Sequence, residues 1–456
     1  MSLILQKIQN HHSDTLALIG ENQSLTYGEL KREITIREKQ LANVSVLGLL
    51  LDNGCDWILW DLAAVQAGIP CVPVPPFFTQ EQITNVIQSA GISHVISADG
   101  ITATRASAAN GIHEKTAKVT FTSGTTGDPK GVCLSQEGME QVALSLIGVL
   151  GAEMAQRHVS ILPLAVLLEN VAGVYATLLA GGMVYLPSLQ TLGFKNPFQP
   201  DFHKLADYLT LHEITTAIVV PELLRGLISV RPDLPALKFM AVGGSKISPH
   251  LISTARNIGL PVYEGYGLSE CASVVSLNTP ENDQLGSVGR VLPHIELKEK
   301  DGEIIVRNSA FLGYLGERHC GEYPTGDLGQ VGRDGFLRIT GRKKNTLITS
   351  FGRNISPEWV ESILLSQPEI LQVIVSGDAQ PFLSALIVPV SAQANIEEAL
   401  QRANCCLPEY AQIKTFQLVP PFTVAEETLT GTGRPRREQI IKQSQEKNHE
   451  LLPQTC

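Results

Sequence analysis

Short apolar runs alternate with amphipathic segments through the first 280 residues of the chain. The run Val44–Leu51 is apolar on both faces, as is typical of a strand in a parallel sheet that helices cover. Thr26-x-x-Glu29 and Thr79-x-x-Gln82 are capping boxes, and each predicts the start of a helix between two such runs. The pattern predicts repeated β-α units with right-handed crossovers and a ligand site at the carboxyl ends of the strands.

The remaining apolar runs of this region are short and regularly placed. They predict strands at 71–76, where prolines end the strand, and at 94–97, 118–122, 159–162, 183–186, 216–220, 239–242 and 262–263. Residues 100–115 are rich in Ser, Ala, Asn and Gly, which favours a loop.

The pattern changes after Pro280. Asp301-Gly302 and Asp334-Gly335 are strong hairpin signals between alternating segments, and they predict a small antiparallel β subdomain. Beyond a polar, basic stretch at 342–344, a compact tail follows with a helix expected over Pro357–Ser366. The expected fold is therefore α/β: a large N-terminal domain of stacked β-α sheets (1–342) and a small α+β domain (345–456).

Composition restricts the function classes. Hydrophobic residues make up 43% and charged residues 18% of the chain, which describes a globular protein. The net charge of −10 disfavours nucleic acid or an anionic membrane as the main partner. The eight cysteines form no CxxC motif and are expected to be reduced thiols in a cytoplasmic protein. The N-terminal apolar run is too short for a secretory signal, and no stretch approaches the roughly 18 apolar residues of a transmembrane helix.

The segment Phe121–Gly131 is the first candidate for chemistry. It holds three glycines, four hydroxyls and Lys130 directly after an expected strand. Glycines let backbone N–H groups converge on an anion, and hydroxyls and a lysine add donors and charge, so the segment suits a polyphosphate. The alternative is a solvated surface turn. It is not an ordinary kinase P-loop, because Pro129 stands in place of the second glycine and no Ser or Thr follows the lysine.

Two further segments carry candidate residues. In Val262–Glu270, Tyr266 lies between two glycines and can lie flat against a base, and Glu270 can hold Mg2+ on phosphates; the alternative is a tight turn. In Tyr323–Gly329, the carboxylate of Asp327 can accept two hydrogen bonds from a ribose diol; the alternative is an Asx-turn.

Together with Gly341–Lys344 and Ser350–Glu361, these segments resemble, in order, the motifs of the acyl-adenylate-forming (AMP-binding) superfamily, and their texture is most similar to fatty acyl-CoA synthetases. The resemblance covers nearly the whole chain after about residue 20. It implies a small domain that rotates about a hinge near Lys344. It also implies ATP, Mg2+ and CoA or phosphopantetheine as cofactors, with a carboxylic acid as substrate and CoA or an acyl carrier protein as thiol donor.

The resemblance also implies roles for individual residues. The catalytic residues would be Lys130, Thr126, Glu270 and Arg434, and the metal ligands Glu270 and Thr126. Nucleotide or cofactor contacts would come from Thr122, Ser123, Gly124, Thr125, Thr126, Gly127, Lys130, Gly244, Glu264, Gly265, Tyr266, Gly267, Ser269, Asp327, Arg342, Lys344 and Gly352. Within this set Asp327 and Arg342 would bind ribose, and Gly352 would lie along the pantetheine arm.

Three positions depart from the family pattern. Ser269 replaces a threonine and keeps the hydroxyl, and Val166 stands where long-chain synthetases usually have histidine, which alters the acyl end of the site. Arg434 occupies the place of the adenylating lysine, and a planar guanidinium is not equivalent to an ammonium there.

Two hypotheses follow for function. The first is an AMP-forming ligase that activates a carboxylic acid, expected to be a fatty acid, and transfers it to a thiol. The second is an adenylation-impaired accessory protein that binds nucleotide or acyl-adenylate, because of Arg434. A P-loop kinase, which would release ADP, fits the glycine-rich segment poorly.

Overall fold

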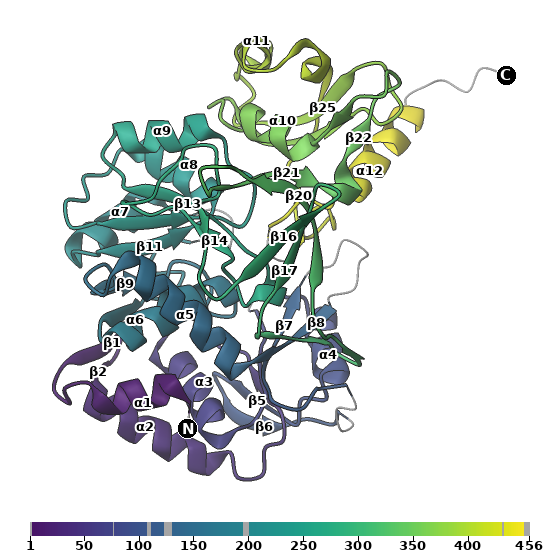
Figure 1. Cartoon of the computed structure of the whole chain (residues 1–456). Coiled ribbons are helices and arrows are strands. Elements are labelled where there is room, and N and C mark those ends of the chain that lie inside the picture. Colours follow the sequence, from purple (N-terminus) through teal and green to yellow (C-terminus); the bar gives the residue numbers. More distant parts are fainter. Residues whose placement is uncertain are drawn as a thin grey trace.

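The computed structural model describes residues 2–75, 77–106, 111–122, 130–194, 200–430 and 433–450, with side chains described up to 446. Figure 1 shows a large domain, from the purple N-terminal helices through the teal elements, and a small domain in light green and yellow beside it. The architecture is mixed α/β, with a large N-terminal and a smaller C-terminal domain, as the sequence predicts.

The first large sheet has nine strands in the order β15-β14-β13-β12-β11-β9-β10-β1-β2. Its strands are β1 (Leu16–Gly20), β2 (Ser24–Thr26), β9 (Arg157–Val159), β10 (Met183–Leu186), β11 (Thr216–Val219), β12 (Phe239–Val242), β13 (Val262–Tyr266), β14 (Ser276–Leu277) and β15 (Arg290–Val291). The run from β1 to β13 within this order is parallel throughout, which confirms the β-α reading of this region.

The second large sheet has eight strands in the order β19-β18-β8-β7-β4-β3-β5-β6. Its strands are β3 (Leu47–Leu49), β4 (Cys71–Pro73), β5 (His94–Ser97), β6 (Gly100–Ala103), β7 (Thr116–Thr122), β8 (Lys130–Ser135), β18 (Phe311–Tyr314) and β19 (Glu317–Arg318). Strands β7 and β8 pair antiparallel up to Thr122 and Lys130, so the glycine-rich segment connects the two strands of a hairpin.

Helices cover these sheets in the large domain. They are α1 (Leu3–Asn10), α2 (Tyr27–Gln40), α3 (Cys55–Ala67), α4 (Gln80–Ser89), α5 (Gln136–Leu150), the π-helix η1 (Leu168–Tyr175), α6 (Ala176–Ala180), α7 (Phe202–Leu211), α8 (Pro221–Val230), α9 (Pro249–Asn257) and the short η2 (Ser269–Cys271). Both predicted capping boxes are present, at Thr26 and at Thr79.

A four-stranded antiparallel sheet forms the predicted β subdomain. It consists of β16 (Glu296–Lys300), β17 (Glu303–Arg307), β20 (Tyr323–Val331) and β21 (Leu337–Arg342). Both Asp-Gly pairs lie at its turns, between β16 and β17 and between β20 and β21.

The small domain contains η3 (Lys343–Asn345), β22 (Leu347–Ile348), β23 (Asn354–Ile355), α10 (Pro357–Leu364), β24 (Ile370–Ser376), β25 (Leu383–Pro389), α11 (Ile396–Cys405), η4 (Glu409–Ala411), β26 (Ile413–Leu418) and α12 (Arg437–Glu450). Its cores are built from residues between Leu347 and Ile440. The last helix is tied to this core by an ion pair of Arg437 with Glu361, 2.7 Å apart, and both side chains are largely buried.

Two predictions about strands are wrong. Residues 100–103, expected in a loop, form β6, which pairs antiparallel with β5 through a tight turn at Ser97–Gly100. This strand is exposed along its whole length at a sheet edge, so no apolar alternation marked it in the sequence. The strand expected over 44–51 is shortened to β3, because both its neighbours in the sheet pair with only Leu47–Leu49.

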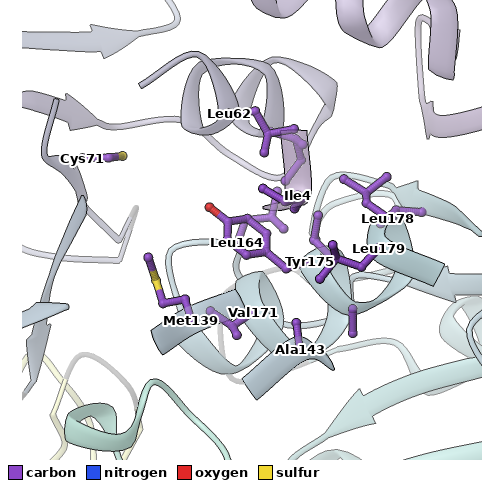
Figure 2. Packing of buried hydrophobic residues seen from close by; sticks show 14 of the residues in the cluster. Ile4, Leu62, Cys71, Met139, Ala143, Leu164, Val171, Tyr175, Leu178 and Leu179 are labelled. Atoms are coloured by element: carbon purple, nitrogen blue, oxygen red, sulfur yellow. The ribbon is translucent and has the colours of Figure 1, made fainter. Parts of the chain in front are cut away.

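The main core of the large domain packs α1, α3, α5, η1 and α6 together, and Figure 2 shows Ile4, Leu62, Met139 and Val171 among its side chains. A buried polar cluster lies within it. The ammonium of Lys118 pairs with Asp61 at 2.8 Å, and the hydroxyl of Tyr175 donates to the same carboxylate at 2.9 Å. No helix in the described part of the chain is long and apolar enough to cross a bilayer.

Candidate active site

A cavity of about 1680 Å³ opens at the carboxyl ends of β12 and β13. It brings together segments from distant parts of the sequence: residues 120–122, 161–168, 241–245, 265–269 and 433–435. The sequence analysis placed a ligand site at these strand ends, and the two glycine-containing segments after β12 and β13 both line the cavity. Its volume exceeds the roughly 300–1,000 Å³ of most small-molecule pockets, so a nucleotide and a second large group have room together.

Glycines shape the two strand ends. Gly244 has φ +91°, in the left-handed region that favours glycine, and it lets the chain turn sharply after β12. A Cβ atom on Gly267 would lie 1.5 Å from the carbonyl oxygen of Ser273, so no larger residue fits there. The predicted residues Gly244, Gly265, Tyr266, Gly267 and Ser269 therefore form a backbone-lined wall of the cavity.

Tyr266 connects this wall to the predicted ribose carboxylate. Its hydroxyl donates to Asp327 Oδ2 at 2.6 Å, and Arg342 Nε lies 2.9 Å from Asp327 Oδ1. Asp327 is buried, and its backbone N–H donates to Thr325 Oγ1. Burial raises the pKa of Tyr266, and the Asp327 carboxylate adds to the rise, so the phenol stays a donor. The structure thus brings Tyr266, Asp327 and Arg342 together.

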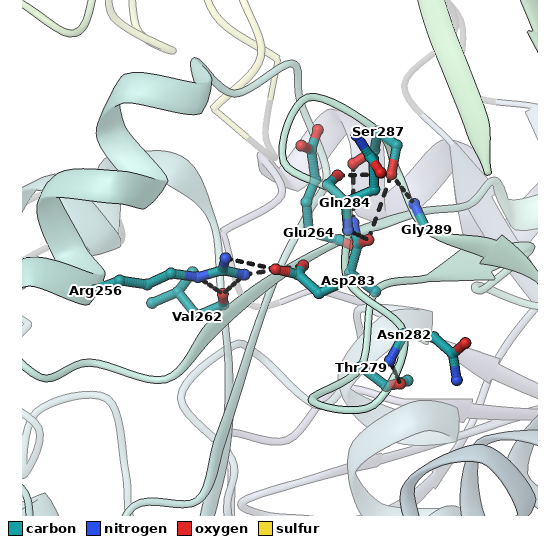
Figure 3. A network of polar contacts seen from close by, with 10 residues as sticks. Arg256, Val262, Glu264, Thr279, Asn282, Asp283, Gln284, Ser287 and Gly289 are labelled. Carbon is teal, nitrogen blue, oxygen red and sulfur yellow. Dashed lines mark hydrogen bonds and ion pairs between the residues drawn. The ribbon is translucent and has the colours of Figure 1, made fainter. Parts of the chain in front are cut away.

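A polar network behind the wall fixes β13 (Figure 3). Asn278 Nδ2 donates to the carbonyl of Glu264 at 3.1 Å and to that of Ser287 at 2.9 Å. Arg256 pairs with Asp283 at 2.6 Å and donates to the carbonyl of Val262. Because these bonds hold the backbone of β13 within the protein itself, the wall residues are positioned before any ligand binds.

Glu264, in the middle of β13, is buried. Its neighbours Gly265 and Tyr266 line the cavity, whereas Glu264 is not among the described lining residues. Burial raises the pKa of its carboxyl group to about 8, against the opposing effect of Lys246. A carboxyl with that pKa is mostly protonated at pH 7.

Glu270 is held by two tyrosines. The hydroxyls of Tyr314 and Tyr323 donate to the same oxygen, Glu270 Oε1, at 2.7 and 3.1 Å, and lie 2.8 Å from each other. Burial raises the pKa of Tyr323 to about 12, so both phenols serve as donors at neutral pH. Lys130 Nζ lies 5.3 Å from the centre of the Tyr314 ring. The predicted cation Lys130 and the predicted metal ligand Glu270 therefore flank one tyrosine.

Arg434 reaches the large domain from the small one. Its Nη2 donates to the carbonyl of Gly244 at 3.0 Å, and the residue lines the cavity. Desolvation in the cleft lowers the pKa of Arg434 and nearby Arg342 lowers it further, while Asp327, Glu222 and Glu270 oppose the change. The guanidinium is thus close to the anionic groups of the site, although solvent still reaches it through the opening of the cleft.

The other predicted residues fall into two groups. Ser123, Gly124, Thr125, Thr126 and Gly127 lie outside the described residues; only the ends of their segment, Thr122 and Lys130, are described. Gly352 and its neighbour Phe351 are exposed on the small domain, and Gly352 is not among the described residues that line the cavity. Lys344 lies in η3 between the domains, where desolvation and Arg342 lower its pKa.

Sequence reasoning missed three residues of the site. Tyr314 and Tyr323, which hold Glu270, look in the sequence like ordinary strand aromatics, and the contact joins residues 44 and 53 positions apart. Arg225, on α8, lines the cavity and donates to carbonyls of the small domain. No sequence signal separates it from other helical arginines.

Comparison with family models gives two matches. A model described as AMP-binding enzyme matches residues 5–119 and 106–315, and one described as AMP-binding enzyme C-terminal domain matches residues 344–450. Together they cover most of the chain, and their boundary falls close to the linker predicted at 342–344.

Curated relatives carry two kinds of name. The chain is 33% identical over 236 residues to a long-chain-fatty-acid–CoA ligase of Mycobacterium bovis, a match covering 44% of the chain and only 39% of that protein. It is 25% identical over 478 residues to a 2-succinylbenzoate–CoA ligase of Staphylococcus epidermidis, covering 96% of the chain and 97% of the relative.

Solved structures share the fold. An O-succinylbenzoate coenzyme A synthetase from Bacillus subtilis in complex with AMP superposes with a TM-score of 0.80 at 23% identity, covering 96% of this chain and 98% of that one. An anthranilate CoA ligase in complex with anthranoyl-AMP superposes with a TM-score of 0.82 at 16% identity, covering 97% of each chain.

Proposed function

Because the chain belongs to the AMP-binding enzyme family, we propose that it is an AMP-forming acid–thiol ligase. It would use ATP to activate a carboxylic acid as an acyl-adenylate and then transfer the acyl group to the thiol of CoA or of a carrier protein. AMP and pyrophosphate would be released.

The cavity carries this proposal. Tyr266 and Arg434 line one part of it, and Asp327 and Arg342 adjoin this part through the hydroxyl of Tyr266, so a nucleotide would lie there. The rest is walled by apolar side chains from α5, η1, β12 and α8. A site that joins a polar nucleotide end to a deep apolar space suits a reaction between ATP and an apolar acid.

In the first half-reaction a carboxylate oxygen attacks the α-phosphorus of ATP. The bond from that phosphorus to the oxygen bridging to the β-phosphorus breaks, and pyrophosphate leaves with the electron pair. The barrier is lowered mainly by compensating negative charge. Lys130 and Arg434 would supply positive charge, the Thr122–Thr126 hydroxyls would donate to phosphate oxygens, and Asp327 would hold the ribose. Tyr266 and Arg342 keep the buried Asp327 carboxylate in place.

In the second half-reaction the thiol sulfur attacks the acyl carbonyl carbon, and the bond to the phosphate oxygen of AMP breaks. Gly352 is remote from the cavity in this conformation, so the small domain would have to turn about Lys344 to bring it near. We take the division at 342–345 and this rotation as part of the proposal.

Magnesium fits the residues present. Mg2+ is usually bound by one or two carboxylates together with substrate phosphates. Glu270 supplies one carboxylate, and the two tyrosine hydroxyls donate to its Oε1 and hold the group in place. A solved relative contains ATP and magnesium. Bound there, the ion would neutralise phosphate charge.

We favour an apolar monocarboxylic acid, such as a fatty acid, as substrate. Relatives are named for long-chain fatty acids and for 2-succinylbenzoate, which carries a second carboxylate. Two basic residues of the cavity are already engaged: His158 lies 2.7 Å from Glu169, and Arg225 donates to small-domain carbonyls. Arg231 and His250 also line the cavity, so the test below compares an acid that has one carboxylate with one that has two.

The experiment is a panel of acids incubated with purified protein, ATP, Mg2+ and hydroxylamine. Hydroxamate with AMP and pyrophosphate is expected, with palmitate exceeding 2-succinylbenzoate. Ala172→Phe places a larger side chain at η1 and narrows the apolar part of the cavity. It should therefore reduce activity with the long palmitate more than with the short hexanoate. Release of ADP, or no hydroxamate with any acid, would contradict the proposal.

The second candidate is an accessory protein that binds nucleotide without adenylating an acid. One observation favours it: Arg434 Nη2 already donates to the carbonyl of Gly244, so this donor is not directed at a substrate. Arg434→Lys and Arg434→Gln separate the candidates. If the ligase proposal holds, Arg434→Gln loses hydroxamate formation. If the accessory role holds, wild type is inactive, and a gain of activity in Arg434→Lys identifies the arginine as the cause.

A further inference from the structure

Arg225 joins the two domains by three hydrogen bonds. From α8 of the large domain, its Nη1 donates to the carbonyls of Leu365 and Ile370, both at 3.2 Å, and its Nη2 donates to the carbonyl of Leu371 at 3.3 Å. All three acceptors belong to the small domain. One guanidinium therefore satisfies three backbone groups on the other side of the domain boundary.

The small domain presents these carbonyls together for identifiable reasons. Leu365 is the C-cap of α10, where the last carbonyls of a helix lack partners within the helix and carry its negative dipole end. Ile370 begins β24, an edge strand of its sheet, and the register of β24 against β25 shifts between Ile370 and Gln372. Such a bulge turns neighbouring carbonyls toward the same side. The three carbonyl oxygens therefore form an acceptor site that suits the planar guanidinium group of an arginine.

The large domain presents the arginine from a constrained position. Pro221 starts α8 and fixes its first turn, and Glu222, one turn before Arg225, adds negative charge beside it. Burial lowers the pKa of Arg225, and its proximity to Glu222 opposes this. The arginine remains charged, so removing its partners would leave a partly buried cation to be hydrated.

The same docking brings Arg434 to the carbonyl of Gly244. The two contacts, at Arg225 and at Arg434, run in opposite directions across the boundary, and both line the one cavity. Rotation of the small domain would break the three hydrogen bonds of Arg225 and, at the same time, move Arg434 away from Gly244.

We propose that Arg225 is a positioning residue that holds the small domain in the orientation for the first half-reaction, with Arg434 in the cleft. This inference rests on the proposed function for its chemical consequence. The three bonds favour the docked orientation over the rotated one. Arg225 therefore shifts the equilibrium between the domain orientations that serve the first and the second half-reaction.

The test compares both half-reactions in Arg225→Gln. Acid-dependent exchange of pyrophosphate into ATP is expected to fall about tenfold, since hydrogen bonds to a charged group change equilibria by about that factor. Thioester formation from a pre-formed acyl-adenylate should stay the same or rise. Arg225→Lys, which keeps the charge but lacks the fork, should lie between Arg225→Gln and wild type.

Arg402→Gln is the matched control. Arg402 binds Gln367 and Glu369 in the turn that carries the acceptor carbonyls, but both of these contacts lie inside the small domain. It should leave the ratio of the two half-reactions unchanged. An equal loss of both half-reactions in Arg225→Gln, or the same change of ratio in Arg402→Gln, would overturn the proposal.

Hydrogen exchange measured by mass spectrometry gives a readout that needs no substrate. In Arg225→Gln the amides of 365–369 and 433–436 should exchange several-fold faster, while residues 372–376 of the β24–β25 ladder keep their protection. Unchanged exchange in these segments would refute the positioning role of Arg225 even if the protein is an active ligase. An inactive wild type refutes the proposed function but leaves this measurement valid.

Discussion

Replacing Glu264 with glutamine should change the pH dependence of stability in a predictable way. The carboxyl is buried in β13, and its pKa is raised from the ordinary 4.5 to about 8. The folded protein then holds this proton more tightly than the unfolded chain does. Its stabilising effect is complete below about pH 4.5 and is lost as the pH rises through 8.

The magnitude follows from linkage. A rise of the pKa from 4.5 to about 8 corresponds to roughly 5 kcal/mol at full effect, and local relaxation reduces this to about 2–5 kcal/mol. Glutamine has nearly the same shape and never ionises. Glu264→Gln should therefore match wild type near pH 5 and exceed its free energy of unfolding by that amount above pH 8.

Urea denaturation followed by tryptophan fluorescence at several pH values measures this difference. Trp57 and Trp60 lie in α3 of the large domain, so a Trp359→Phe background restricts the signal to that domain. Glu281→Gln, on the exposed loop after β14, is the control. If the difference between Glu264→Gln and wild type is constant from pH 5 to pH 9, the reasoning fails. A large rise in the KM for ATP in Glu264→Gln would instead support the predicted contact of Glu264 with the nucleotide.

Three further predictions concern the site and its support. Tyr314→Phe removes one donor to Glu270 and should weaken the apparent Mg2+ affinity about five- to tenfold, measured by magnesium titration of pyrophosphate release; no effect in a Glu270→Gln background would confirm that it acts through that carboxylate. Asp327→Asn should raise the KM for ATP by about 10- to 100-fold while leaving the KM for the acid within about twofold; equal rises would contradict a ribose contact. Lys118→Met leaves Asp61 buried without its cation and should cost about 3–5 kcal/mol in the free energy of unfolding, seen as a lower Tm; a change under about 1 kcal/mol would show that the pair is not needed.

The sequence predicted the parallel sheets, the hairpin subdomain and the small domain because local patterns encode them. Both capping boxes and both Asp-Gly turns are where the sequence placed them. It also predicted that Tyr266, Asp327 and Arg342 would share a site, through their resemblance to known motifs. The exposed edge strand β6 was not predicted, because it has no buried face and therefore no alternation of apolar and polar residues.

What the sequence could not supply were contacts made only in three dimensions. Asn278, 14 residues further along the chain, holds the backbone carbonyl of Glu264, and no local pattern reports this contact. The tyrosines that hold Glu270 come from strands β18 and β20, in two different sheets. The carbonyls that Arg225 binds are backbone groups, whose position no side-chain pattern reports.

The buried pair of Arg437 and Glu361 fastens the C-terminal segment to the small domain three residues beyond Arg434. Three residues of extended chain span only about 10 Å. Arg434 is thus on a short tether and travels with the body to which it is tied. Under the proposed function, the guanidinium could not lie beside the phosphates while Gly352 is turned toward the thiol. The two half-reactions would then have to alternate, and a product could leave at each change.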